Sequence, residues 1–220
     1  MKKSTRLCIT AQLLLLAFLL FTIAVMGVDV RPIGPRGSTV GLAGLNEAAR
    51  EIFGVHTLWY DVTKYLGAAI LLLAAGMALL GLGQLLRRRS LGRVDRPILC
   101  LAGLYVLLGA VYLFFEHCVI NYRPLLLETE LEASYPSSHT MLAVCILFSA
   151  LPELHRLAGE RRGLRFFADA LAVVLAAVMV VGRLLSGVHW CTDILGGVLL
   201  SAALCVLYCA VLCRWEEPQG

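Results

Sequence analysis

The chain has 220 residues, of which 60% are hydrophobic and 15% are charged, and its mean hydropathy is +0.83. This composition excludes a water-soluble globular domain. The formal net charge of +4 comes from short basic segments between apolar ones, so it gives no indication of nucleic-acid binding.

Six apolar segments are long enough to cross a bilayer as helices. They are Leu7–Val28, Tyr65–Leu86, Ile98–Ile120, Thr140–Leu154, Phe166–Leu185 and Cys191–Cys213. The fourth is short unless its helix starts at Ser137 or continues to Arg156. Because six spans leave no room for a second domain, we expect an all-α polytopic membrane protein with a single transmembrane domain over residues 1–220. The first segment lacks a small-x-small cleavage site, so it predicts a membrane anchor and not a cleaved signal.

The long connector between the first two spans has two halves of different character. Its first half is rich in proline and glycine and is predicted to be an irregular loop. In its second half apolar residues recur at helical spacing, and they are Leu45, Ala49, Ile52, Phe53 and His56. This pattern predicts an amphipathic helix that lies on the outer leaflet, with His56 as a packing residue.

The distribution of lysine and arginine predicts the orientation of the chain in the membrane. With the N-terminus inside, thirteen basic residues lie in the inner segments and six in the outer segments. Because basic residues are retained in the cytoplasm, we expect both termini of this multi-pass cell-membrane protein to be cytoplasmic. The eight cysteines all lie in or beside apolar segments, so they are interpreted as helix-packing residues and not as zinc ligands or disulfides.

Three polar clusters fall at span ends that this orientation places on one outer face. FFEHCVINYRP ends the third span with Arg123 and Pro124, and YPSSHT starts the fourth. GRLLSGVHWCTD, between the fifth and sixth spans, contains the pattern Arg-x5-His-x3-Asp. If HWCTD is helical, His189 and Asp193 share one helix face. A carboxylate that holds one ring nitrogen of a histidine leaves the other free to attack.

The remaining groups in these clusters favour the binding of an anion. Ser137, Ser138 and His139 begin a helix, and its free N–H groups and dipole attract negative charge. Arg123 and Arg183 add positive charge on the same face. Charged and polar groups at the boundary of so apolar a protein indicate a functional site.

The order Arg-Pro, Pro-Ser-x-His, Arg-x5-His-x3-Asp resembles the type-2 phosphatidic acid phosphatase superfamily of membrane lipid phosphatases, over Glu116–Asp193. The resemblance implies that His189 attacks phosphorus to give a phosphohistidine and that Asp193 orients it. It implies that His139 protonates the leaving lipid oxygen and then activates water. Arg123, Ser137, the backbone near Ser138, and Arg183 would hold the phosphate oxygens, so that no metal and no cofactor is required.

The sequence departs from the family pattern at three positions. Glu116 stands where the family usually has a lysine, Ser138 replaces a glycine, and Gly182 replaces a serine. An unpaired carboxylate beside a phosphate would repel it. We therefore expect Glu116 to point towards Arg123 or Arg183 and to position that guanidinium.

These observations predict a lipid phosphatase with its active site on the extracytoplasmic side. Its expected partners are the bilayer and a lipid phosphate, such as phosphatidate, phosphatidylglycerophosphate or a polyprenyl diphosphate. Two alternatives stay open: a phosphotransferase that passes phosphate to a lipid or sugar, and a non-catalytic protein that binds lipid phosphates. A transporter is disfavoured, because no charged residue lies mid-span and no broken helix is evident.

Overall fold

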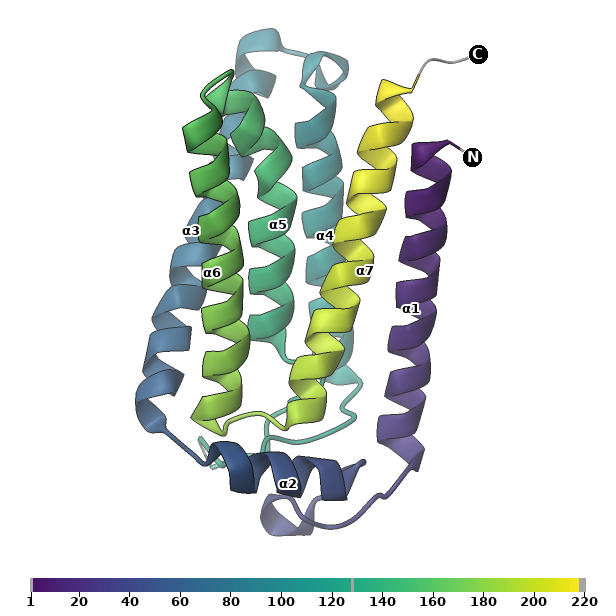
Figure 1. The fold of residues 1–220 in the computed structure, drawn as a ribbon, viewed down its shortest axis with the longest axis vertical. Coiled ribbons are helices and arrows are strands. Elements are labelled where there is room, and N and C mark those ends of the chain that lie inside the picture. Colours follow the sequence, from purple (N-terminus) through teal and green to yellow (C-terminus); the bar gives the residue numbers. More distant parts are fainter. Residues whose placement is uncertain (1, 128, 218–220) are drawn as a thin grey trace.

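Six long helices run side by side in a bundle, and a shorter helix lies across one end (Figure 1). The computed structural model describes residues 2–127 and 129–217. Its α-helices are α1 (Lys3–Gly27), α2 (Ala43–Phe53), α3 (Thr57–Arg88), α4 (Arg96–His117), α5 (Ser138–Ala158), α6 (Arg162–Ser186) and α7 (Cys191–Glu216). All except α2 are long and apolar enough to cross a membrane. The predicted all-α fold with six transmembrane helices is confirmed, and the chain is a multi-pass membrane protein.

Two span boundaries differ from simple hydropathy. Helix α3 begins at Thr57, eight residues before the predicted start. Hydropathy placed the start too late because the polar residues Asp61 and Lys64 lie inside the helix. Its 32 residues extend over about 48 Å, more than the roughly 30 Å of a hydrocarbon core. Helix α5 takes the longer form considered for the fourth span, and it continues past Pro152 to Ala158.

Helices α5 and α7 form the centre of the bundle. About half of the apolar stretch of each is buried, 56% in α5 and 50% in α7, whereas the other four spans bury 11–22%. The outer helices expose large apolar side chains, among them Leu72, Val106 and Phe166. Such a surface fits contact with lipid, because hydrocarbon does not penalise exposed apolar groups.

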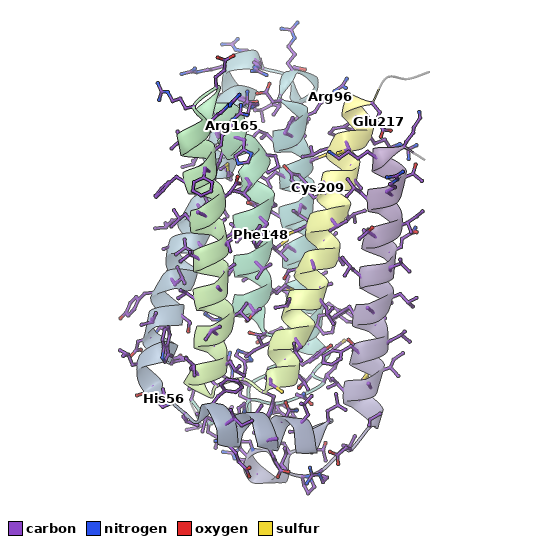
Figure 2. The ribbon with its side chains drawn as sticks, in the orientation of Figure 1. His56, Arg96, Phe148, Arg165, Cys209 and Glu217 are labelled. Carbon is purple, nitrogen blue, oxygen red and sulfur yellow. The ribbon has the colours of Figure 1, made fainter. Side chains whose placement is uncertain are left out.

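The two ends of the bundle differ in character. The chain termini lie at one end, where Arg96, Arg165 and Glu217 are also found (Figure 2). The opposite end carries α2 and His56 (Figure 2). Helix α2 ends at Phe53, where Gly54 with φ of 69° breaks it. His56 was predicted to belong to this amphipathic helix, but it directly precedes α3.

Candidate active site

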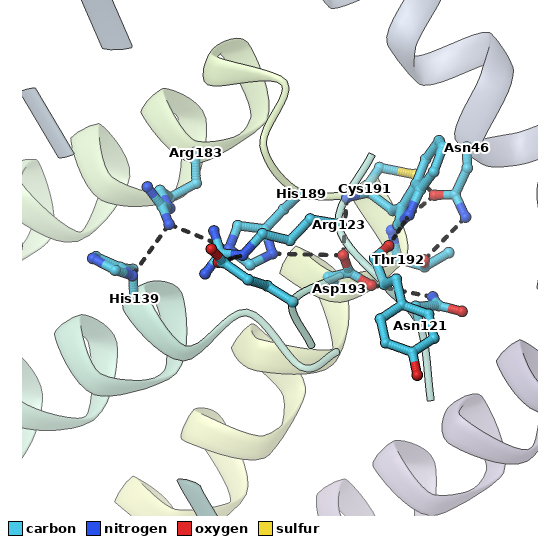
Figure 3. A network of polar contacts seen from close by, with 12 residues as sticks. Asn46, Asn121, Arg123, His139, Arg183, His189, Cys191, Thr192 and Asp193 are labelled. Carbon is cyan, nitrogen blue, oxygen red and sulfur yellow. Dashed lines mark hydrogen bonds and ion pairs between the residues drawn. The ribbon is translucent and has the colours of Figure 1, made fainter. Parts of the chain in front are cut away.

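The three polar clusters meet at the end of the bundle that carries α2 (Figure 3). Arg183 comes from the last turn of α6, and His139 from the first turn of α5. His189 and Asp193 come from the start of α7, and Arg123 from the connector between α4 and α5. Segments that are far apart in the sequence thus form one site.

Arg183 lies at the centre of this site and is completely buried. Its Nη2 donates to Nδ1 of His139 at 3.1 Å and to Nε2 of His189 at 3.2 Å. Because an imidazole nitrogen that accepts a hydrogen bond carries no proton, this pattern assigns the proton of neutral His189 to Nδ1. The lone pair of His189 Nε2 therefore faces the arginine.

Helix α3 holds the other side of the same guanidinium. Arg183 Nη1 donates to Thr63 Oγ1 at 3.3 Å, and the guanidinium lies 5.7 Å from the centre of the Tyr60 ring. A side chain at Gly182 would meet Thr63 at 2.6 Å, so the serine usual at this position in the family does not fit here. The close approach of α3 and α6 thus explains Gly182 and brings Thr63 to the arginine.

His189 and Asp193 are paired, although not in the way the sequence predicted. Helix α7 starts at Cys191, so His189 precedes it and the two residues do not share a helix face. Asp193 is the third helical residue, and its carboxylate turns back to accept the N–H of Trp190 at 2.9 Å, as residues in a first helical turn do. This capping geometry brings Asp193 Oδ2 to 3.5 Å from His189 Nδ1.

The environment of Asp193 fixes its position. It is completely buried, and its second oxygen accepts the side-chain N–H of Asn121 at 3.2 Å. Its backbone carbonyl accepts the N–H of Ser137 at 2.9 Å, which ties the start of α5 to the first turn of α7. Asn121 was missed in the sequence, where its position two residues before Arg123 was the available signal.

Burial and positive charge keep His189 neutral. Its environment excludes water, and the guanidinium groups of Arg183 and Arg123 disfavour a second positive charge. Both effects lower the pKa of His189 well below its ordinary value of 6.5. The histidine is therefore unprotonated at neutral pH, which is the form a nucleophile requires.

A short hairpin holds Arg123 in place. The N–H of Arg123 donates to the carbonyl of Glu132 at 3.0 Å, and the N–H of Ser134 donates to the carbonyl of Asn121 at 2.9 Å. The side chains of Arg123 and Glu132 form an ion pair of 2.8 Å between Nε and Oε2. Arg123 thus has a carboxylate partner, although the partner is not Glu116.

The predicted role of Glu116 is wrong in this respect. Its side chain is exposed, and within the described part of the chain no ion pair joins it to Arg123 or Arg183. The physical reason is that α4 ends at His117, and the chain then turns towards α7 before it reaches Arg123. In the acidic segment after Arg123, Glu132 belongs to the site and a carboxylate oxygen of Glu130 lies 4.0 Å from the guanidinium of Arg36. Glu128 lies outside the described residues.

The start of α5 offers further hydrogen-bond donors. Ser137 precedes the helix and is fully buried, and among the described residues its hydroxyl has no hydrogen-bond partner. Ser138 and His139 are the first helical residues, whose N–H groups have no partner within the helix. An unpartnered buried hydroxyl beside free N–H groups is suited to an anion.

Helix α2 fastens the start of α7. The buried Asn46 accepts the backbone N–H of Thr192 at 3.2 Å and donates to the Thr192 hydroxyl at 3.1 Å. The amphipathic pattern had indicated only a surface helix, yet its buried Asn46 holds the first turn of α7.

Comparison with known proteins gives one family and one similar fold. Residues 113–216 match the model described as the PAP2 superfamily. This region of the chain belongs to the PAP2 superfamily. The PAP2 region contains all eight site residues named from the sequence, Glu116 included, whereas Asn46, Tyr60 and Thr63 precede it. No curated protein sequence matches the chain.

A solved structure of a "transmembrane PAP2 type phosphatidylglycerolphosphate phosphatase" from Bacillus subtilis has the same fold. The TM-score is 0.62 at 19% sequence identity, and the match covers 95% of this chain and 98% of that one. The similarity therefore includes α1, α2 and α3, which lie outside the PAP2 region.

Proposed function

We propose that this protein is an integral-membrane lipid phosphatase that acts through a phosphohistidine on His189. The observation that carries the proposal is the shared arginine. One Arg183 nitrogen lies between His139 and His189, and a carboxylate lies behind His189. A phosphate that binds this guanidinium would meet a nucleophile on one side and a proton donor on the other.

The first chemical step forms the phosphoenzyme. A phosphate oxygen is a stronger acceptor for the Arg183 N–H than a neutral imidazole, so phosphate binding frees His189 Nε2. The Nε2 lone pair attacks phosphorus, and the bond to the lipid oxygen breaks. Phosphate binding likewise frees His139 Nδ1 from Arg183, and this nitrogen takes up a proton from solvent. The leaving oxygen then takes a proton from the His139 imidazolium, which becomes neutral imidazole. Asp193 stabilises the positive charge that develops on His189 through its Nδ1–H.

The second step releases phosphate. His139 accepts a proton from a water molecule, the water oxygen attacks phosphorus, and the P–N bond breaks to give inorganic phosphate and neutral His189. Throughout, Arg123, Arg183, Ser137 and the N–H groups of Ser138 and His139 stabilise the charge on the phosphoryl oxygens. These donors perform the role that a metal ion has in other phosphoryl-transfer enzymes.

Phosphate release tests this proposal and its metal independence together. The purified protein in neutral detergent is supplied with phosphatidate, phosphatidylglycerophosphate and a polyprenyl diphosphate, with and without EDTA. We expect release from at least one lipid at a rate that EDTA leaves unchanged. Loss of activity in EDTA with recovery in magnesium would contradict metal independence. A phosphoprotein that forms without phosphate release would favour a transferase, and binding without either would favour a non-catalytic protein.

We also propose that the site faces the extracytoplasmic side and that both termini are cytoplasmic, as the lysine and arginine distribution predicts. Cys118 tests this, because it is exposed at the end of α4 that leads to Arg123. We expect a membrane-impermeant maleimide to label intact cells at Cys118, with Cys118→Ser as the unlabelled control. Labelling that needs permeabilised cells would place the site in the cytoplasm.

A further inference from the structure

A cavity adjoins the site on the side of His139. It has a volume of about 410 Å³ and lies between α3, α4 and α5, within the range of about 300–1,000 Å³ typical of ligand pockets. Apolar residues form most of its wall, including Leu71, Leu142 and Ile146. Its polar lining consists of Lys64, Tyr112, Ser138 and His139.

His139 belongs to both the site and the cavity, and this shared position indicates which part of the substrate would occupy the cavity. The phosphoryl oxygens bind on the side of Arg183 and Arg123, whereas His139 donates its proton to the leaving oxygen. The atoms beyond that oxygen therefore lie on the far side of His139, in the cavity. Its apolar wall suits a hydrocarbon chain.

Lys64 is close to this path on α3. Gly67 lies three residues further, on the same helix face. A side-chain carbon at Gly67 would lie 3.1 Å from the His139 ring, so α3 passes directly beside the histidine. Lys64 is thus placed about one helical turn from the point where α3 touches His139.

The charges around the cavity are unbalanced. No carboxylate is among its lining residues, and Lys64 has no ion pair within the described part of the chain. Arg123 and Arg183 are engaged with Glu132 and with the two histidines. Glu116 lines a neighbouring hollow that shares Tyr112 and Ser138 with the cavity, but it forms no ion pair with Lys64 there. An anionic ligand would complement Lys64.

We propose that Lys64 binds a second anionic group on the leaving side of the substrate. This inference rests on the proposed function and narrows it. The preferred substrate is a lipid whose leaving group keeps a negative charge, either as the inner phosphate of a diphosphate or as a phosphodiester. Phosphatidate, whose leaving group is a neutral diacylglycerol, lacks this contact.

Matched substrates test the proposal by steady-state kinetics in neutral-detergent micelles. The pairs are farnesyl diphosphate with farnesyl monophosphate, and phosphatidylglycerophosphate with phosphatidate. We expect the wild type to prefer the member with two phosphate groups in at least one pair. Lys64→Gln should lower kcat/KM for that member about tenfold, mainly through KM, because a hydrogen bond to a charged group is lost. The effect of Lys64→Gln on the member with one phosphate group should be small.

Two control variants accompany this test. Lys64→Arg keeps the charge and should retain most of the preference, and Lys3→Gln removes a lysine at the opposite end of the bundle and should change nothing. The pair that responds identifies the diphosphate or the phosphodiester as the ligand. An equal effect of Lys64→Gln on both members, or none, would overturn the proposal and assign Lys64 to general attraction of anionic lipids.

A binding measurement separates this inference from the proposed catalytic function. Farnesyl methylenebisphosphonate and farnesyl phosphonate are not hydrolysed at their P–C bonds, so their affinities are measured without turnover. Tighter binding of the bisphosphonate that Lys64→Gln abolishes would support the Lys64 site even in a protein that releases no phosphate. Phosphate release with equal affinities for the two compounds would support the phosphatase and reject the site.

Discussion

His189→Ala is expected to abolish phosphate release while the protein still folds. In the site only His189 combines an unprotonated ring nitrogen next to the arginine with a carboxylate at its other nitrogen. Removal of a nucleophile costs about 10⁴-fold or more in kcat, because the remaining donors stabilise charge and form no covalent intermediate. The direct readout is an acid-labile phosphoprotein, which wild type should form after rapid quenching and His189→Ala should not.

Asp193→Asn is the graded control for this prediction. Asparagine keeps an oxygen that accepts the N–H of Trp190, so the start of α7 is preserved. It loses the negative charge that stabilises imidazolium, so turnover should fall and still remain measurable. Wild-type turnover in His189→Ala would end the phosphohistidine mechanism. Equal loss in both variants together with a lower melting temperature would indicate damage to the fold.

The lowered pKa of His189 predicts a second measurable property of His189→Ala, the pH dependence of its stability. The folded protein keeps this histidine neutral, whereas the unfolded chain binds a proton there near pH 6.5. The unfolded state therefore binds more protons below pH 6.5, and the stability associated with His189 is present above that pH and lost as the pH falls. Between pH 7 and pH 5 the melting temperature of His189→Ala should decline less than that of the wild type.

The part of the site that was predictable from the sequence lies within one stretch of the chain. Arg123, His139, Arg183 and His189 lie at or near the ends of spans whose hydropathy is unmistakable, and alternation of six spans places them at one end of the bundle. Spacing alone also paired His189 with Asp193. The structural reason for this pair was predicted wrongly, because the contact comes from the cap of α7 and not from a shared helix face.

The residues that were missed come from helix packing. Thr63 reaches Arg183 only because Gly182 lets α3 approach α6, and Asn46 reaches Thr192 only because α2 folds over the end of the bundle. Neither residue is close in sequence to the one it contacts. The same limit applies to Glu132, whose pairing with Arg123 depends on a hairpin that no apolar pattern indicates.

Arg183→Lys is expected to lower kcat at least about 100-fold, although the positive charge is kept. The guanidinium donates to two histidines through one nitrogen and to Thr63 through another, while its plane lies near Tyr60. A lysine ammonium is a single point and does not reproduce these separate directions. The phosphoryl group would lose its alignment between His139 and His189, and a misplacement of about 1 Å costs on the order of 100-fold in rate.

Two further variants show whether geometry, charge or folding accounts for the loss. Thr63→Val removes only the contact with Nη1, so we expect a smaller fall in kcat with little change in KM. Arg36→Lys is the matched control, because Arg36 is an exposed arginine at the same end of the bundle, and it should behave as wild type. If Arg183→Lys retained full kcat, positive charge alone would suffice at this position. The central observation behind the proposed mechanism, one guanidinium held between two histidines, would then have no catalytic role.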